Sequence, residues 1–116
     1  MKVTRKQKLS GATYKIGTGC GNLYVTINEN EGKPFEVFAT MGKAGGCAAS
    51  QIETIGRLIS LGLRNEVKIG DVIRQMNGVC CHSAIVVDGE NVLSCADAIT
   101  KALKRYVEEK NIIKEK

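Results

Sequence analysis

The chain has 116 residues, enough for one domain with one modest core. Its composition is that of a globular protein, with 43% hydrophobic and 25% charged residues, although aromatics make up only 4% and tryptophan is absent. The net charge of +5 is compatible with anionic partners, but no aromatic residue is interleaved with the basic ones, as base stacking would favour.

Neither a membrane segment nor a secretory signal is predicted. The sequence contains no run of about 18 apolar residues, and its first residues lack the apolar stretch that follows the basic part of a signal. We therefore expect a cytoplasmic protein with no membrane partner. Five cysteines in that compartment should stay reduced, which leaves buried thiols, a metal site or redox chemistry as their roles.

The first part of the chain predicts an arm followed by strands. Residues 1–10 form a basic N-terminal arm without periodicity, and a first strand is expected over Ala12–Thr18. Alternation over Leu23–Asn28 and Phe35–Thr40 predicts a half-buried hairpin, about residues 23–40. The turn is expected at Asn30–Pro34, because glycine suits a turn backbone and proline cannot pair in mid-strand.

A long helix is predicted over about Cys47–Asn65. One stripe carries aliphatic residues at helical spacing, which Leu58 widens, namely Ile52, Ile55, Leu58, Ile59 and Leu63. Gly56 and Gly62 interrupt this helix, where each glycine costs about 1 kcal/mol relative to alanine. Close packing against a neighbouring element would justify that cost.

The second half predicts two more helices and a small turn region. A short helix is expected from about Ile69 to Met76, and Gly78 ends it. Short extended pieces over Ala84–Val87 and Asn91–Leu93 flank a turn candidate at residues 88–90.

The last helix is predicted to start at Ser94, whose spacing from Asp97 matches an S-x-x-D capping pattern. Its apolar face is formed by Ala98, Ile99, Ala102, Leu103, Tyr106 and Val107. The charged residues from Lys110 onward are expected to fray. The prediction is one α+β domain over 11–110 with a charged tail at 111–116: a small antiparallel sheet with two to three helices packed on one face.

All five cysteines fall at the ends of predicted elements, namely Cys20, Cys47, Cys80, Cys81 and Cys95. A core thiol has no reason to prefer element ends, whereas loops and first helical turns can aim several side chains at one metal ion. Helix N-termini also favour the thiolate, which is the form that binds zinc. This pattern predicts a structural zinc site.

One cysteine from each of four separate segments makes up the predicted ligand set: Cys20, Cys47, Cys81 and Cys95. Neighbouring cysteines cannot easily both bind one tetrahedral ion, so Cys80 and His82 are alternates. Because the chain has no C-x-x-C pair, buried reduced thiols and a redox pair stay open as alternatives.

A glycine-rich loop precedes the long helix and resembles an anion-binding loop in outline, through Gly42, Lys43, Gly45 and Gly46. It lacks the G-x-x-x-x-G-K-[ST] pattern of a phosphate loop. No nucleophile motif or acid/base pair indicates catalysis, so we expect none from this chain alone.

Three segments resemble the TSCPD domain family, found near the C-terminus of adenosylcobalamin-dependent ribonucleotide reductases: TYKIGTGCGNLYVTINE, GKPFEVFATMGKAGGCAASQIETIGRLISLGLR and VLSCADAITKAL. The similarity covers about Gly11 to Tyr106. The family is named for Thr-Ser-Cys-Pro-Asp, and the corresponding residues here are Leu93, Ser94, Cys95, Ala96 and Asp97, with leucine in place of threonine and alanine in place of proline. The cysteines that match the family are the four predicted ligands, although His82 stands where the family typically has proline.

The resemblance implies a relation to ribonucleotide reduction. The barrel that holds the radical cysteine and the cobalamin has no counterpart here, so adenosylcobalamin is implied only for the larger enzyme. Our leading hypothesis is an accessory or regulatory module that docks on a reductase catalytic subunit. The alternatives are a nucleotide or nucleic-acid binding protein and a small thiol redox protein. Self-association is also compatible with a small sheet that has exposed edges.

Overall fold

The computed structural model describes residues 4–19, 21–42, 46–81, 84–87 and 89–115, and of 46–48 and 112–115 only the backbone. The elements in chain order are β1 (Ser10–Thr18), β2 (Gly21–Asn30), β3 (Lys33–Met41), α1 (Gly46–Arg64), α2 (Ile69–Met76), β4 (Ile85–Val87), β5 (Glu90–Val92) and α3 (Cys95–Glu115). This is the predicted α+β class. Among the described residues, no helix has the length and apolar character needed to cross a membrane.

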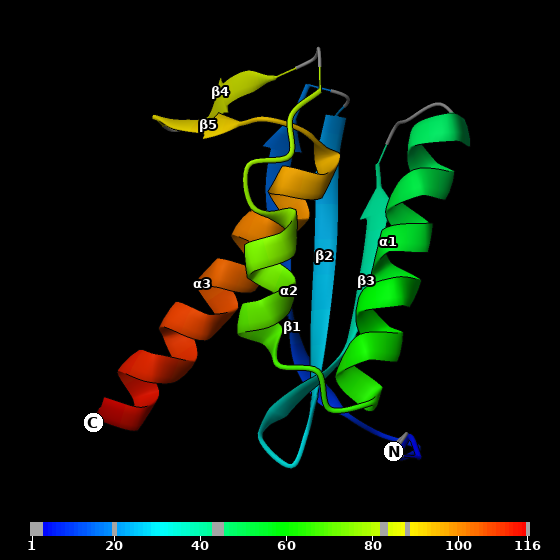
Figure 1. Ribbon diagram of the computed structural model, residues 1–116, viewed down its shortest axis with the longest axis vertical. Coiled ribbons are helices and arrows are strands. Elements are labelled where there is room, and N and C mark those ends of the chain that lie inside the picture. The colour runs from blue at the N-terminus through cyan, green and yellow to red at the C-terminus, as the bar shows by residue number, and fades with distance from the viewer. Residues whose placement is uncertain (1–3, 20, 43–45, 82–83, 88, 116) are drawn as a thin grey trace.

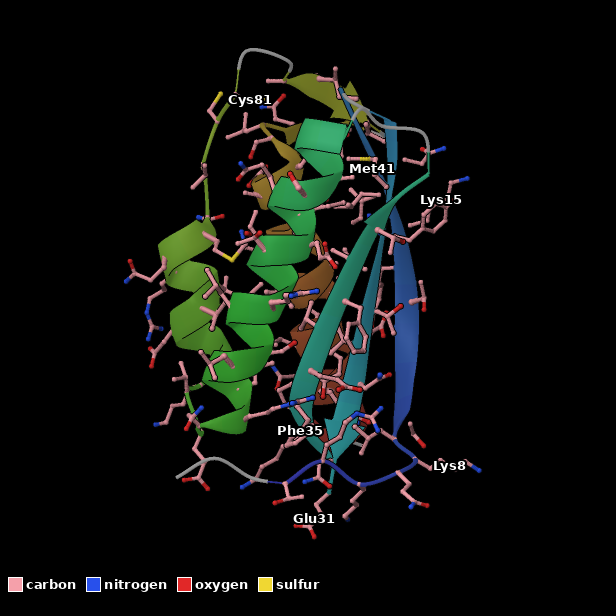
Figure 2. The ribbon with its side chains drawn as sticks, turned by 90° about the vertical axis from the view of Figure 1, so that its right-hand side faces the viewer. Lys8, Lys15, Glu31, Phe35, Met41 and Cys81 are labelled. Atoms are coloured by element: carbon pink, nitrogen blue, oxygen red, sulfur yellow. The ribbon has the colours of Figure 1, made fainter. Side chains whose placement is uncertain are left out.

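The molecule has two layers (Figure 1). Strands β1, β2 and β3 form an antiparallel sheet in that order, and β4 and β5 form a separate small hairpin. The helices lie on one side of the three-stranded sheet, with α1 along β3 and α3 against β1 and β2. Figure 2 shows that the other face of this sheet carries no helix.

The core lies between the sheet and the helices. Its sheet side is the inward row of β2, where Leu23, Val25 and Ile27 are completely buried. Its helix side is formed by Ile52, Ile59, Leu63, Ala98, Ile99, Ala102, Leu103 and Tyr106. Burying each large aliphatic side chain contributes about 1.5–3 kcal/mol, so this aliphatic layer can replace an aromatic core.

The β2–β3 hairpin is longer and its turn is tighter than the sequence predicts. Only Glu31 and Gly32 lie outside the strands, and both have positive φ, 54° and 77°. Two such residues match the right-handed twist of the flanking strands. Pro34 lies inside β3 opposite Glu29, next to a shift in register after Asn28. A bulge of this kind is where a strand tolerates proline.

The placement of Leu58 in the apolar stripe of α1 is wrong, because this side chain is 64% exposed. The helix turns a different side to β3. A Cβ atom on Gly56 would lie 3.2 Å from the Val37 carbonyl oxygen, and the Ser60 hydroxyl bonds to both the Val37 N–H (2.9 Å) and its carbonyl (3.0 Å). Leu58 is two residues from Gly56, about 200° around the helix, and so faces outward.

Helix α3 begins at Cys95, directly after the predicted cap Ser94, and it continues to Glu115, past Lys110, where the sequence predicts a fraying tail. A polar anchor holds the helix as far as Lys110. The Tyr106 hydroxyl donates to Glu29 on β2 at 2.5 Å, and the Lys110 ammonium lies 2.5 Å from the same carboxylate. These contacts tie the later turns of α3 to the sheet.

Candidate functional site

The N-terminus of α3 is a capped helix start that carries Cys95. The Ser94 hydroxyl accepts a hydrogen bond from the Asp97 N–H at 2.9 Å, which confirms the predicted cap. The Cys95 side chain is half-buried in the first helical turn.

The buried Asp97 carboxylate holds two other segments at this helix start. It accepts hydrogen bonds from the Leu93 N–H at 3.1 Å and from the Gly78 N–H at 3.3 Å. Gly78 ends the turn after α2, so the chain that leaves α2 is fixed beside the beginning of α3. The Asp97 side chain therefore anchors both the residue before the Ser94 cap and the loop after α2.

The segment that carries Cys81 runs along this anchor. The Cys81 N–H donates to the Leu93 carbonyl at 2.8 Å, and the Ser94 hydroxyl donates to the Val79 carbonyl at 2.5 Å. The half-buried Cys81 is thereby held next to the residues that lead into Cys95.

The β1–β2 turn also reaches this end of the molecule. The Thr18 hydroxyl donates to the Gly21 carbonyl across the turn at 2.8 Å, and the Cys95 Sγ lies 3.9 Å from Thr18 Oγ1. Cys20 belongs to this turn but lies outside the described residues.

The end of β3 and the start of α1 lie at the same end of the sheet as the β1–β2 turn (Figure 1). The Gly42 N–H donates to the Asn22 carbonyl at 3.0 Å, so β3 ends beside the β1–β2 turn. Helix α1 begins at Gly46, and Cys47 lies in its first turn, although the Cys47 side chain is not among those described.

The zinc site as a whole stays a prediction. Among the described residues, no three His, Cys, Asp or Glu side chains form a group that could hold a metal ion. That statement does not cover Cys20, the Cys47 side chain or His82, which fall outside the described residues. Of the alternates, Cys80 is exposed, with its thiol 3.3 Å from the Cys81 carbonyl oxygen.

The glycine-rich loop before α1 also stays a prediction as an anion site. The Gly42 N–H donates to the Asn22 carbonyl and is therefore not available to an anion, and Gly46 is the first residue of α1. Lys43 and Gly45 lie beyond the part of the chain that the structure describes.

Sequence reasoning missed a buried ion cluster around Glu36. The alternation of β3 points Glu36 away from the core, yet its exposure is 0%. Arg5 Nε and Nη2 donate to its two carboxylate oxygens at 2.9 Å each, and Asn28 (2.8 Å) and Arg64 (3.0 Å) complete the shell. Burial raises the pKa of Glu36, but these hydrogen bonds outweigh it, and the pKa lies below its ordinary value.

The cluster fastens the N-terminal arm and the end of α1 to the sheet. Arg5 comes from the arm, and the Arg64 guanidinium also lies 5.2 Å from the Phe35 ring centroid. The only sequence signal for it was a charged residue on a strand next to a basic arm, which is too common to indicate a buried pair.

Comparison with known proteins gives one match. A model of the TSCPD domain family matches residues 1–107, which covers most of the chain. No curated protein and no solved structure matches it.

Proposed function

This chain belongs to the TSCPD domain family, which occurs in the C-terminal region of adenosylcobalamin-dependent ribonucleotide reductases, and from that premise we propose an accessory role. The protein acts as a non-catalytic binding module of the reductase system, and a structural zinc ion fastens its cysteine-bearing end. Its partner is a reductase catalytic subunit.

The approach of cysteine-bearing segments at one end of the sheet supports the zinc part. Cys95 Sγ is 3.9 Å from Thr18, two residues before Cys20, and the Cys81 N–H bonds to Leu93, two residues before Cys95. Thiolates are ligands that zinc prefers, and a helix N-terminus supports one of them. Segments from across the chain would be joined by one ion, as in a closed structural site.

Metal analysis tests the zinc site. We expect about one zinc per chain in the purified protein, and Cys95→Ser should lose it. Chelation should lower Tm by about 10 °C or more, because each 1 kcal/mol corresponds to about 4–8 °C in a domain of this size. Cys80→Ser is the matched control and should retain the zinc. Purified protein without metal, together with a melt that chelator leaves unchanged, would remove the zinc site from the proposal.

A binding experiment with the purified partner tests the proposed accessory role. The protein should form a complex with a purified adenosylcobalamin-dependent reductase catalytic subunit, seen as co-elution in size-exclusion chromatography. The zinc-depleted protein, at a temperature where it is still folded, should bind more weakly. Failure of the zinc-loaded protein to co-elute at micromolar concentrations would contradict the accessory role and leave the metal site unaffected.

A further inference from the structure

One face of the three-stranded sheet carries no helix, and its centre is open (Figure 2). The side chains that the strand alternation directs to its centre are Thr13, Lys15, Tyr24, Thr26, Phe38 and Thr40. The opposite rows of β2 and β3 are buried against the helices, so this pattern divides the sheet into a core face and a free face.

Two of the chain's five aromatic residues lie on this free face. Phe38 is 51% exposed and Tyr24 is 37% exposed. Phe38 pairs with Thr26 across the strands, and Tyr24 pairs with Thr40, so the two rings are diagonal neighbours. Diagonal neighbours in a sheet lie about 7–8 Å apart, close enough to form one platform.

The charge next to this platform is positive. Lys15 lies directly opposite Tyr24 in the β1–β2 register, and Lys15 and Lys8 both point to the side away from the helices (Figure 2). Among the described residues of the three-stranded sheet, Glu36 is the only carboxylate directed to this face, and Arg5 and Arg64 already pair with it. An anionic ligand at the two rings would therefore meet no unpaired carboxylate of this sheet, and beside Lys15 it would meet Glu90 of β5 together with Lys101 and Arg105.

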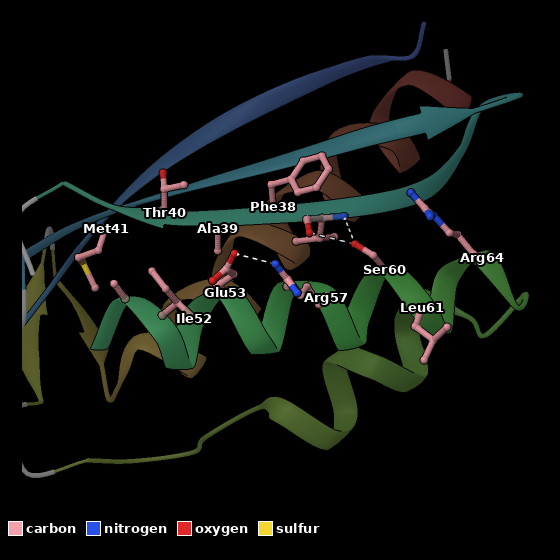
Figure 3. Close-up of a pocket in the computed structure, with 13 residues that line it drawn as sticks. Phe38, Ala39, Thr40, Met41, Ile52, Glu53, Arg57, Ser60, Leu61 and Arg64 are labelled. Atoms are coloured by element: carbon pink, nitrogen blue, oxygen red, sulfur yellow. Dashed lines mark hydrogen bonds and ion pairs between the residues drawn. The ribbon is translucent and has the colours of Figure 1, made fainter. Parts of the chain in front are cut away.

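The platform continues into a groove at the edge of β3 (Figure 3). Phe38 and Thr40 line a cavity of about 680 Å³ between β3 and α1, which falls in the range of ligand sites. Its wall on α1 includes Arg57, which pairs with Glu53. A chain that crosses the two rings could leave the sheet along this groove.

We propose that this free face binds single-stranded nucleic acid. Two successive bases stack on Tyr24 and Phe38, and the Lys15 ammonium lies against the backbone phosphate between or beside them. Exposed aromatics on an open sheet are a recurring way to hold unpaired bases, and stacking is tolerant of sequence because every base has a flat face. Duplex bases are already stacked on one another and cannot reach the rings. A protein partner is less well matched, because threonines and a lysine surround the two rings.

Fluorescence anisotropy with a labelled 12-nucleotide single strand, over a salt series, tests this site. Phe38→Ala and Tyr24→Ala should each weaken binding by about tenfold, whereas Phe38→Trp should keep it. Lys15→Gln should weaken binding and reduce the slope of log K against log salt by about 0.7. The exposed helix residue Leu58 and the exposed Lys68 supply controls, since Leu58→Ala and Lys68→Gln should change the affinity less than twofold.

Three results would overturn the proposal: no affinity at low salt, equal affinity for a duplex of the same length, or affinity that both alanine variants retain. Thermal melts of the variants would verify that they fold. We expect them to fold, because both rings are exposed and removing them leaves no cavity in the core. If Phe38→Ala instead abolishes self-association and the wild type binds no oligonucleotide, the face is an interface between copies of the chain.

Discussion

At the scale of single residues, Glu36 shows how one side chain can join distant parts of a small protein. Its carboxylate is fully buried and accepts hydrogen bonds from the N-terminal arm, from β2 and from the end of α1. Burying a charge is costly unless it is paired and hydrogen-bonded, and here both oxygens have two partners. The cluster is therefore stable as a unit and sensitive to the loss of any central member.

Substitution of the central carboxylate should be costly. Glu36→Gln should lower the free energy of unfolding by about 2–3 kcal/mol, less than the ~3–5 kcal/mol typical of a broken buried pair, because the arginines reach solvent. Urea unfolding measures the change. The exposed pair of Glu53 and Arg57 is the control, and Arg57→Gln should cost under about 0.5 kcal/mol. Equal effects of the two substitutions would contradict a special role for the cluster.

The free energy of unfolding should also decrease as the pH is lowered. The pKa of Glu36 and that of Glu29 are lowered in the folded protein, in each case because hydrogen bonds to the charged form outweigh the effect of burial. As the pH falls, these carboxylates are therefore protonated in the unfolded chain before they are protonated in the folded protein. Their contribution to stability is complete above the ordinary pKa of 4.5 and is lost as the pH falls through their lower pKa values in the folded protein. The urea concentration at the unfolding midpoint should therefore decrease as the pH is lowered below about 4.5, and it should decrease less steeply for Glu36→Gln. A midpoint that stays constant down to pH 3 would contradict this assignment.

At the scale of elements, the contact between α1 and β3 depends on a helix that comes unusually close to an edge strand. Gly56 permits the approach, and Ser60 satisfies both backbone groups of Val37. An edge strand with unpaired backbone groups invites association with other chains, and a helix that covers it prevents this. In the described structure, α1 therefore both closes the core and protects part of the β3 edge.

The two glycines of α1 should respond differently to substitution. Gly56→Val should destabilise the protein by about 1–3 kcal/mol, because its side chain would meet the Val37 carbonyl. Gly62→Ala should be neutral or stabilise by up to about 1 kcal/mol, since its Cβ would make only an ordinary contact with Val67, 3.7 Å away. Thermal or urea unfolding of both variants measures this. A stabilising Gly56→Val would show that the close approach is not required.

At the scale of the whole molecule, the structure separates two kinds of surface. The cysteine-bearing segments gather at one end of the sheet (Figure 1). Strand alternation instead directs Tyr24 and Phe38 to the face of the sheet that carries no helix. The proposed zinc ion would fasten the first region, and the proposed nucleic-acid site would use the second. The two proposals rest on different side chains, so each has its own substitutions and its own measurement.

The sequence by itself determined the elements, the capped start of α3 and the family. Alternation, helical spacing and a local S-x-x-D pattern are short-range signals, and the family motifs are read directly from the chain. Where the predicted elements differ from the structure, they differ at their ends, as at the tight turn of Glu31 and Gly32.

Only the tertiary structure decided which faces are covered and which residues meet. Leu58 is exposed because α1 turns its other side to β3, and Glu36 is buried because Arg5 of the arm and Arg64 of α1 pair with it. Neither follows from periodicity. Lys15 and the aromatic Tyr24 are nine residues apart in sequence, yet strand register sets them opposite each other. Local preference fixes what a segment becomes, whereas non-local packing fixes what surrounds each side chain, and it is the surroundings that make a site.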